Sequence, residues 1–455
     1  MKILHYSLGV PPYRSGGLTK YSIDLMLNQR DLGHEVFLLY PGHFSIFKKL
    51  KIVGNSDFKG IKVFEIVNPL PVSLLGGIKK PELFLQKTEK EKYIDFIKKL
   101  NPEIIHLHTF MGLHKEFLEA AKECRVKIVY TTHDYFGICP KVNLMDTNQE
   151  VCDDFDEGNR CISCNMNGYS SSMLFLLQSK TYRTLKESSV VKKARTIKKG
   201  KEGQTTVQTI PEKNKSSNEG TAEDYVKLRN YYLSMFNLVD SFHFNSTLTK
   251  KEYEKYLHLS GKVIPIAHND INDNRVKREF FSKEKPLKIT YIGPIDAYKG
   301  FFLLKESLDY LLSKNISNWH LSVYGNAHEN IEYDSNFYSF YGRYNYNELE
   351  KIFNNTDVLV IPSIWKETFG FIGLEALSHS IPILASEFVG FNDLIEDKIT
   401  GFIFEPNVEG LATSLEDIIE NRELLTKINE NINNMVLNFA MKKHTEEIIN
   451  FYKII

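Results

Sequence analysis

The sequence predicts an α/β protein with two doubly wound domains, each built on a mostly parallel sheet. Short apolar runs alternate with segments of helical period up to residue 133, and the same alternation begins again at residue 287. Strands that alternate with helices form βαβ units, in which the strands are parallel. The runs are almost continuously apolar, as strands covered on both faces require. A chain of 455 residues is also too long for one ordinary core.

The first domain is predicted at residues 1–270. Its strands are expected at 1–6, 34–40, 61–66, 103–108 and 127–133, where apolar residues run together. Helices are expected at 16–33, which Gly33 closes, at 81–100, and between the last two strands. A Cys-rich and basic insertion that fits neither pattern is expected at about 139–225.

The second domain is predicted at residues 271–435. Strands are expected at 287–293, 320–325, 357–362, 381–386 and 401–406, with helical segments between most of them. The change between the domains falls in a charged stretch that ends at Pro286. The helical run from Val408 to Ile455 is longer than this domain needs. The final helix, at 436–455, is therefore expected to pack back on the first domain.

The composition is that of a folded protein with no excess charge. Hydrophobic residues make up 42% and charged residues 25%, and Lys plus Arg equals Asp plus Glu at 57 each. A net charge of zero argues against a surface built to bind nucleic acid. The N-terminus lacks the pattern of a signal peptide, and no run approaches the ~18 apolar residues of a membrane span. We therefore expect a cytoplasmic location.

The second part of the insertion is strongly basic. Residues 180–219 hold eleven Lys or Arg against four Asp or Glu, a net charge of +7. Residues 198–221 show no apolar period, which is typical of a solvated surface loop. The same charge would also suit contact with anionic lipid at the inner face of the plasma membrane, or with a polyanionic acceptor. Both interpretations stay open.

A glycine pair follows the first strand. Ligands of doubly wound sheets bind beyond the carboxyl ends of the strands, where helix N-termini point. Gly16 and Gly17 open the first helix, and without side chains they let backbone N–H groups approach a phosphate closely. The turn has no G-x-G-x-x-G pattern, which makes a dinucleotide oxidoreductase less favoured.

Histidines end two neighbouring strands of the first domain. His106 and His108 end one strand, and His133 with Asp134 ends the next. A single histidine at a strand end is usually a packed or capping residue. Two strands that end in this way favour a site for a polar ligand, where Asp134 would orient the imidazole of His133 or alter its proton affinity.

Charged residues follow the strands of the second domain in the same manner. Lys299 and Gly300 begin a helix after a strand, where a lysine can meet a diphosphate as a point charge. Glu367 lies on a loop and Glu375 within the helix that follows it. One carboxylate accepts hydrogen bonds from two hydroxyls, which suits a ribose or a hexose.

The motifs that hold these residues resemble a known family. They are "YRSGGLTKY", "HLHTF", "TTHD", "YIGPIDAYKGF" and above all "KETFGFIGLEALSHSIPILAS". The chain resembles the retaining glycosyltransferases of family 4, also called glycosyl transferases group 1, over most of its length outside the insertion. The resemblance implies the GT-B fold, in which two Rossmann-like domains face each other across a cleft.

The resemblance also implies roles for the residues at the strand ends. Gly16 and Gly17 would lie against the donor diphosphate, and His133 over the donor sugar near the reacting carbon. Lys299 would neutralise the leaving diphosphate.

The glutamates of the second domain would hold hydroxyls. Glu367 would bind those of the donor sugar, and Glu375 those of the nucleotide ribose. The backbone of Thr368, Phe369 and Gly370 would lie beside the phosphates. Of all these residues, His133, Lys299 and Glu367 are the predicted catalytic group.

The implied reaction transfers a hexose from a UDP-, GDP- or ADP-sugar to a hydroxyl with retention of the anomeric configuration. The departing diphosphate would act as the base, and the protein would orient the reactants and stabilise charge. No metal is expected for catalysis. Family members of this kind usually act on lipid-linked saccharide or polysaccharide acceptors, in capsule or exopolysaccharide assembly.

The sequence departs from the family at two places. Pro294 stands where an arginine usually contacts the diphosphate, and proline makes no ionic contact. Arg14 or Lys366 is a candidate for the missing charge. Phe391 and Asn392 replace a more usual glycine and small residue, a difference of less weight.

Four of the five cysteines fall in one segment. They are Cys139, Cys152, Cys161 and Cys164, and Cys124 stands apart. Cys161 and Cys164 have the two-residue spacing of a zinc knuckle, and four thiolates would complete a tetrahedral shell. A structural zinc is expected beside the donor site, with reduced thiols as the alternative.

Other functions on this fold stay open. A nucleotide-sugar epimerase would need further acid and base carboxylates, and a phosphorylase an inorganic phosphate site. A non-catalytic partner subunit of an active transferase is the alternative that Pro294 favours. Release of nucleotide from a sugar donor would separate an enzyme from such a partner.

Overall fold

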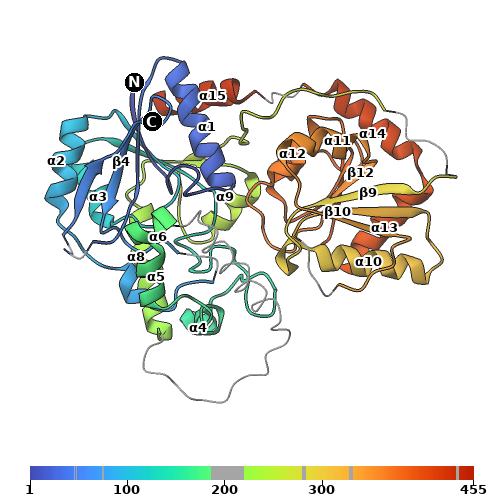
Figure 1. Cartoon of the computed structure of the whole chain (residues 1–455), viewed down its shortest axis with the longest axis horizontal. Helices are drawn as coiled ribbons and strands as arrows, with labels where there is room; N and C mark the ends of the chain where they lie inside the picture. Colours follow the sequence, from blue (N-terminus) through green and yellow to red (C-terminus); the bar gives the residue numbers. More distant parts are fainter. Residues whose placement is uncertain are drawn as a thin grey trace. The chain divides into compact units, whose positions relative to one another are not determined.

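The computed structural model describes residues 1–45, 47, 49–73, 76–185, 220–278, 283–326, 331–436 and 440–455. By their contacts they form two compact units, the first of residues 1–142 and 154–242 with Ile455, the second of residues 143–153 and 243–454. Strands and helices alternate in both (Figure 1). The predicted α/β class with two mostly parallel sheets is therefore confirmed.

The first sheet has eight strands in the order β3-β4-β2-β1-β5-β6-β7-β8. Strand β3 is antiparallel to β4, whereas β4, β2, β1, β5 and β6 pair in parallel. From β1 the chain adds strands first on one side and then, from β5 onward, on the other. This reversal is where doubly wound sheets bind ligands. The strands are β1 (Lys2–Tyr6), β2 (Glu35–Pro41), β3 (Lys51–Gly54), β4 (Lys62–Val67), β5 (Ile104–Leu107), β6 (Lys127–Thr131), β7 (Ser241–Phe244) and β8 (Gly261–Val263).

The helices between these strands follow the predicted order with one correction. The helix expected at 81–100 is wrong in its first half, because a single 3₁₀ turn at Pro81–Phe84 ends before α2 begins at Lys90. Residues 85–89, between the two, are not helical. The helices are α1 (Gly17–Asp31), α2 (Lys90–Leu100), α3 (Lys115–Glu123), α4 (Asn159–Cys164), α5 (Ser171–Leu177), α6 (Lys180–Leu185), α8 (Ala222–Phe236) and α9 (Thr247–Glu254).

The second sheet has six parallel strands in the order β11-β10-β9-β12-β13-β14. Its chain order reverses between β9 and β12. The strand β11 is not among those predicted, since its burial is irregular and its sequence carries no apolar run. The strands are β9 (Leu287–Ile292), β10 (Trp319–Tyr324), β11 (Tyr338–Gly342), β12 (Val358–Ile361), β13 (Ile383–Ser386) and β14 (Phe402–Phe404).

The long helical run at the end of the chain is three helices. One break lies at Asn421 and the other after Met435. Helices α10 and α13 lie side by side (Figure 1). The helices of this half are α10 (Phe301–Ser313), α11 (Leu349–Asn354), α12 (Phe371–Leu377), α13 (Val408–Glu420), α14 (Glu423–Asn434) and α15 (Met441–Lys453).

The predicted domain limits at 270/271 and 435/436 differ from the division by contacts, which falls after Phe242 within β7. His444 of α15 has a ring contact with His243 of β7, with 5.8 Å between the centroids.

The insertion predicted at 139–225 contains α4, α5, α6 and the start of α8. Most of its basic part, residues 186–219, lies outside the described residues, and with it the predicted membrane contact. Across the described ranges, none of the helices has the length and apolar character needed to cross a bilayer.

Candidate functional site

Lys299 and Glu367 are brought together at the reversal of the second sheet. Lys299 ends a 3₁₀ turn after β9, and Glu367 lies on the loop after β12. The Lys299 ammonium donates to one carboxylate oxygen of Glu367 at 2.7 Å, and the Ser363 hydroxyl donates to the other at 2.7 Å. The Lys299 side chain is 23% exposed and that of Glu367 is 14% exposed. The pair is thus fixed in orientation but open to a ligand.

The turn that carries Lys299 depends on a glycine. Gly300 has φ 74° at the start of α10, a conformation that L residues rarely adopt. A Cβ on Gly300 would also collide with the carbonyl oxygen of Pro362, next to the loop of Glu367. The close approach of these two backbones lets Lys299 reach Glu367.

The backbone of the Glu367 loop is held on both sides. The Glu367 N–H donates to the Phe388 carbonyl at 2.8 Å, and the Glu367 carbonyl accepts from Gly390 at 2.9 Å. The carbonyl of Thr368 accepts from the hydroxyls of Ser246 and Thr249 at 2.7 and 3.0 Å. These bonds fix the backbone of Glu367 and Thr368, on the loop that is predicted to lie beside the phosphates.

The rest of this loop explains one departure from the family. The Phe369 carbonyl accepts from the Phe391 N–H at 2.7 Å, and Gly370 has φ 96° where α12 begins. Phe391 is fully buried, and its ring lies where a Cβ on Gly373 would stand. Phe391 is therefore a packing residue for α12.

Glu375 has a separate environment within α12. Its side chain is buried, and one carboxylate oxygen lies 3.1 Å from Nε2 of His268, which is also buried. Nδ1 of His268 has no hydrogen-bond partner among the described residues. Burial and then the charge of Glu375 raise the pKa of Tyr346 well above its ordinary value. The site therefore offers a buried carboxylate beside a ring nitrogen and a tyrosine hydroxyl.

Lys366, a candidate for the missing charge, is held in ion pairs. Lys366 is buried and lies 2.8 Å from Glu252 and 3.2 Å from Asp153, so its charge is compensated within the protein. Pro294 is held by its carbonyl, which accepts from the Tyr291 hydroxyl at 2.6 Å.

In the first unit, the Arg14 guanidinium stacks on the Tyr13 ring at 4.9 Å. Nε of Arg14 is buried and lacks a partner within the described ranges.

Gly16 and Gly17 are exposed at the N-terminus of α1. Gly16 has φ 110°, which favours glycine, and nothing lies within 4 Å of where its Cβ would be. The opening of this helix is therefore accessible, as the predicted phosphate contact requires.

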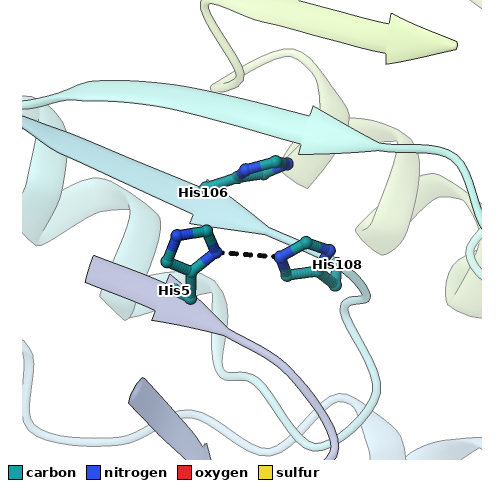
Figure 2. Close-up of side chains that lie close together, drawn as sticks. All are labelled: His5, His106 and His108. Carbon is teal, nitrogen blue, oxygen red and sulfur yellow. Dashed lines mark hydrogen bonds between the residues drawn. The ribbon is translucent and has the colours of Figure 1, made fainter. Parts of the chain in front are cut away.

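The predicted histidines of the first unit lie at the reversal between β1 and β5. His5 of β1 is the register partner of His106 in β5, so both face the same side of the sheet. His5 Nδ1 lies 3.0 Å from His108 Nε2 (Figure 2), and His108 Nδ1 lies 3.1 Å from His133 Nε2. His133 thus belongs to a connected set of rings.

Asp134 has a structural contact of its own. Its carboxylate accepts from the Phe136 N–H at 2.8 Å, and burial raises its pKa to about 6. His108 also contacts His133, with its Nδ1 3.1 Å from Nε2 of His133. The orientation of His133 by Asp134 stays a prediction.

Two of the four predicted zinc ligands, Cys161 and Cys164, lie in α4. Cys161 is buried and Cys164 half-buried at the end of this helix, which packs on α8. Among the described residues, a set of potential metal ligands with all ligand atoms within 4.8 Å is formed by His5, His106 and His108 and by no cysteines. The arrangement therefore gives the cysteine zinc no support, and it stays a prediction.

The sequence missed several partners of the predicted residues. Ser363 and His268 hold the two glutamates, and His5 and Gln29 lie behind His108. The run "MKILHY" carries a signal for His5, since a histidine inside a buried strand needs a polar partner.

Two family models match the chain. One, described as Glycosyltransferase Family 4, matches residues 15–147, and the other, described as Glycosyl transferases group 1, matches residues 272–435. Together they cover more than half of the chain. The first includes Gly16, Gly17 and His133, and the second includes Lys299 and both glutamates.

Curated relatives match over part of their length. The sulfoquinovosyl transferase SQD2 of Arabidopsis thaliana is 32% identical over 153 residues, which are 33% of this chain and 29% of that protein. The capsular polysaccharide biosynthesis glycosyltransferase CapM of Staphylococcus aureus is 27% identical over 210 residues, 44% of this chain and 52% of that protein. The chain thus spans about half or less of the length of these relatives.

A solved structure matches over the whole chain. Anabaena Alr3699/HepE in complex with UDP has a TM-score of 0.59 and 14% identity, and the match covers 100% of both chains. The same protein is also known in complex with UDP-glucose. At this identity the likeness shows the fold, which is GT-B. The two family models, which together cover more than half of the chain, show that this chain belongs to the family 4, or group 1, glycosyltransferases.

Proposed function

We propose that this chain transfers a hexose from a nucleotide sugar to a hydroxyl of a lipid-linked saccharide or polysaccharide acceptor, with retention at the anomeric carbon. The observation that carries the proposal is the Lys299–Glu367–Ser363 cluster at the reversal of the second sheet. It presents an ammonium for a diphosphate and a fixed carboxylate for sugar hydroxyls.

The nucleotide part of the donor would be recognised by Glu375. Its carboxylate has lone pairs beyond the one that faces His268, so two ribose hydroxyls could donate to it. Gly16, Gly17 and His133 keep the diphosphate and donor-sugar roles that the family resemblance gives them. The UDP and UDP-glucose complexes of the structural neighbour support a UDP-sugar as the first donor to test.

The proposed reaction needs no nucleophile from the protein. The bond from the anomeric carbon to the diphosphate breaks, and the acceptor oxygen forms its bond on the same face. The acceptor proton passes to the departing diphosphate. Lys299 would offset the charge that develops on the diphosphate, and Glu367 would hold the sugar in place.

Thermal-shift measurements with UDP-, GDP- and ADP-sugars test the donor class, since a ligand that binds the native state raises the melting temperature. A matching donor should then be consumed in the presence of an acceptor, with an α-linked product from an α-linked donor by NMR. No shift with any of these donors would contradict the proposal. An inverted product would contradict retention alone.

A non-catalytic partner subunit is the second candidate. It is favoured by Pro294, which carries no charge for a diphosphate, and by Lys366, whose charge is paired with Asp153 and Glu252. Such a protein would bind a nucleotide sugar but release no nucleotide from it. Restoring the usual residue with Pro294→Arg should then create or raise turnover, whereas an active enzyme should turn over without this change.

A structural zinc on Cys139, Cys152, Cys161 and Cys164 is also proposed, on the spacing of the last two. Metal analysis of the full chain purified without chelator should find about one zinc per chain. Cys161→Ser should remove it, and Cys124→Ser should not. A wild-type chain without zinc would contradict the site.

A further inference from the structure

An aromatic ring stands against the lysine of the candidate donor site. The ammonium nitrogen of Lys299 lies over the ring of Trp365, 5.2 Å from its centroid. A cation within about 6 Å of a ring centroid is attracted to the face of the ring, and tryptophan gives the strongest contact of this kind. The same nitrogen donates to Glu367 at 2.7 Å. Lys299 is therefore held by a carboxylate and by a ring together.

The ring of Trp365 is itself fixed in place. Trp365 lies on the loop after β12, two positions before Glu367, whereas Lys299 ends the turn after β9. The Ile364 N–H donates to the Tyr298 carbonyl at 3.1 Å, which ties the loop to the turn beside both residues. The rings of Tyr298 and Trp365 meet edge to face, with 5.9 Å between the centroids and 88° between the planes. The ring and the ammonium are thus brought together by the protein alone.

The polar atom of Trp365 does not explain its place. The residue is half-buried, and its Nε1 is buried without a hydrogen-bond partner among the residues that the structure describes. An indole N–H can only donate, and buried donors are normally paired. A tryptophan selected for its N–H would have an acceptor within the protein. We therefore look to the face of the ring, which does have a defined contact.

The charges around the site make the orientation of Lys299 important. Pro294 brings no charge, and the charge of Lys366 is paired with Glu252 and Asp153. A lysine side chain is flexible, and fixing it when a ligand binds costs conformational entropy. A ring that holds the ammonium before the ligand arrives removes part of this cost.

We propose that Trp365 is a positioning residue for Lys299, and that its ring holds the ammonium ready for an oxygen of the donor diphosphate. The role at the diphosphate rests on the proposed function. The contact between the ring and the ammonium does not, since it is present without a ligand. The two parts can therefore be tested separately.

Fluorescence tests the contact without any ligand. The chain has two tryptophans, and Trp319→Phe leaves Trp365 as the one that emits. In this background, Lys299→Met should change the intensity or wavelength of the emission, because it removes the charge over the ring. Lys314→Met is the matched control, since Lys314 also lies over a ring, that of Tyr310 at 4.6 Å. Unchanged emission in Lys299→Met, or an equal change in Lys314→Met, would overturn the contact.

Calorimetry tests the role at the diphosphate, with whichever of UDP, GDP and ADP binds the wild type. Trp365→Leu should lower this affinity by about twofold to thirtyfold, the range that corresponds to one cation–π contact. Trp365→Phe keeps a ring face and should recover most of the affinity. The affinity for the nucleoside should stay unchanged in both variants, since a nucleoside has no phosphate. Trp319→Phe is the control, because Trp319 is buried in β10 and donates to the Ile316 carbonyl at 3.0 Å.

A double variant separates positioning from packing. In the Lys299→Met background, Trp365→Leu should cause no further loss of affinity for the nucleoside diphosphate, because the ring then has no ammonium to hold. An equal loss with and without Lys299 would overturn the proposal. Equal losses in Trp365→Leu and Trp365→Phe would also overturn it, since they would assign the effect to the N–H.

These outcomes are distinct from a failure of the proposed function. If the wild type binds a nucleoside diphosphate but the double variant shows no coupling, the role of Trp365 is wrong and the donor site stands. If the wild type binds none of the three ligands, the proposed function and the role of Trp365 at the diphosphate are both wrong. The fluorescence result for the contact with Lys299 would still hold.

Discussion

Glu375 gives the most direct test of the nucleotide site, through the variant Glu375→Ala. The carboxylate is buried in α12 and faces His268 with one oxygen at 3.1 Å. Two ribose hydroxyls would donate to its remaining lone pairs. Hydrogen bonds to a charged group contribute about 1.5–3 kcal/mol in net terms. Since each ~1.4 kcal/mol is a factor of ten in affinity, Glu375→Ala should weaken binding of a nucleoside diphosphate by about 10- to 150-fold for each hydrogen bond that is lost.

The change also affects the free protein. Glu375→Ala leaves Nε2 of His268 without its partner, next to an Nδ1 that already lacks one in the described structure. An unsatisfied buried donor costs about 1–3 kcal/mol, so the melting temperature should fall as well. Glu375→Gln keeps an oxygen that can face His268 and should lose less of both stability and affinity.

The assay compares two ligands by calorimetry on the folded variant. One is UDP, or whichever nucleoside diphosphate raises the melting temperature, and the other is its 2′,3′-dideoxy analogue. The analogue should bind wild type and variant with nearly equal affinity, because it has no ribose hydroxyls to lose. Equal weakening of both ligands by Glu375→Ala would refute the ribose assignment.

Three further changes probe the rest of the site and the fold. Lys299→Met should lower the affinity for a nucleoside diphosphate by about tenfold or more and leave the affinity for the nucleoside unchanged, as measured by calorimetry. Equal losses of affinity for both ligands would contradict a phosphate contact. Lys366→Met should lower the free energy of unfolding by about 1–3 kcal/mol, because the buried Glu252 loses one of its two lysine partners and keeps Lys255 at 2.8 Å. Nucleotide affinity should stay within about threefold. Burial lowers the pKa of His114 from 6.5 to about 4, so the unfolded chain binds more protons between these values and stability falls as the pH is lowered through them. Urea unfolding at pH 7 and at pH 5 measures how much the free energy of unfolding falls between these two pH values. In His114→Gln this fall should be smaller than in the wild type by about 2 kcal/mol. A fall of the same size in both proteins would contradict the assignment.

The sequence was sufficient for the fold because local patterns carry it. The runs that became β1, β2, β5, β6, β9, β12 and β13 are mostly buried and read as nearly continuous apolar runs. The break between the 3₁₀ turn at 81–84 and α2 could not be seen, because Leu85, Gln86 and Lys87 between them are all residues that favour a helix.

The residues of the candidate site could be predicted from the sequence, whereas most of the contacts that they make could not. Strand ends and family motifs point to Lys299, Glu367 and Glu375, and the first two do meet. The partner of Glu375 could not be foreseen, because His268 lies 107 positions away in the chain. Gln29 was missed for a related reason, since a glutamine on a helix is usually a surface residue.

The compensated charges of the second unit bear on how it would hold a diphosphate. Pro294 contributes no charge, Lys366 is compensated by Glu252 and Asp153, and Lys299 already faces Glu367 at 2.7 Å. A lysine has three donors, so Lys299 can keep Glu367 and still donate to a phosphate. The net charge around the ligand would nevertheless be lower than with an arginine at position 294. Recognition would then depend more on backbone N–H groups and on Glu375 than on unpaired cations, and such contacts are less screened by salt.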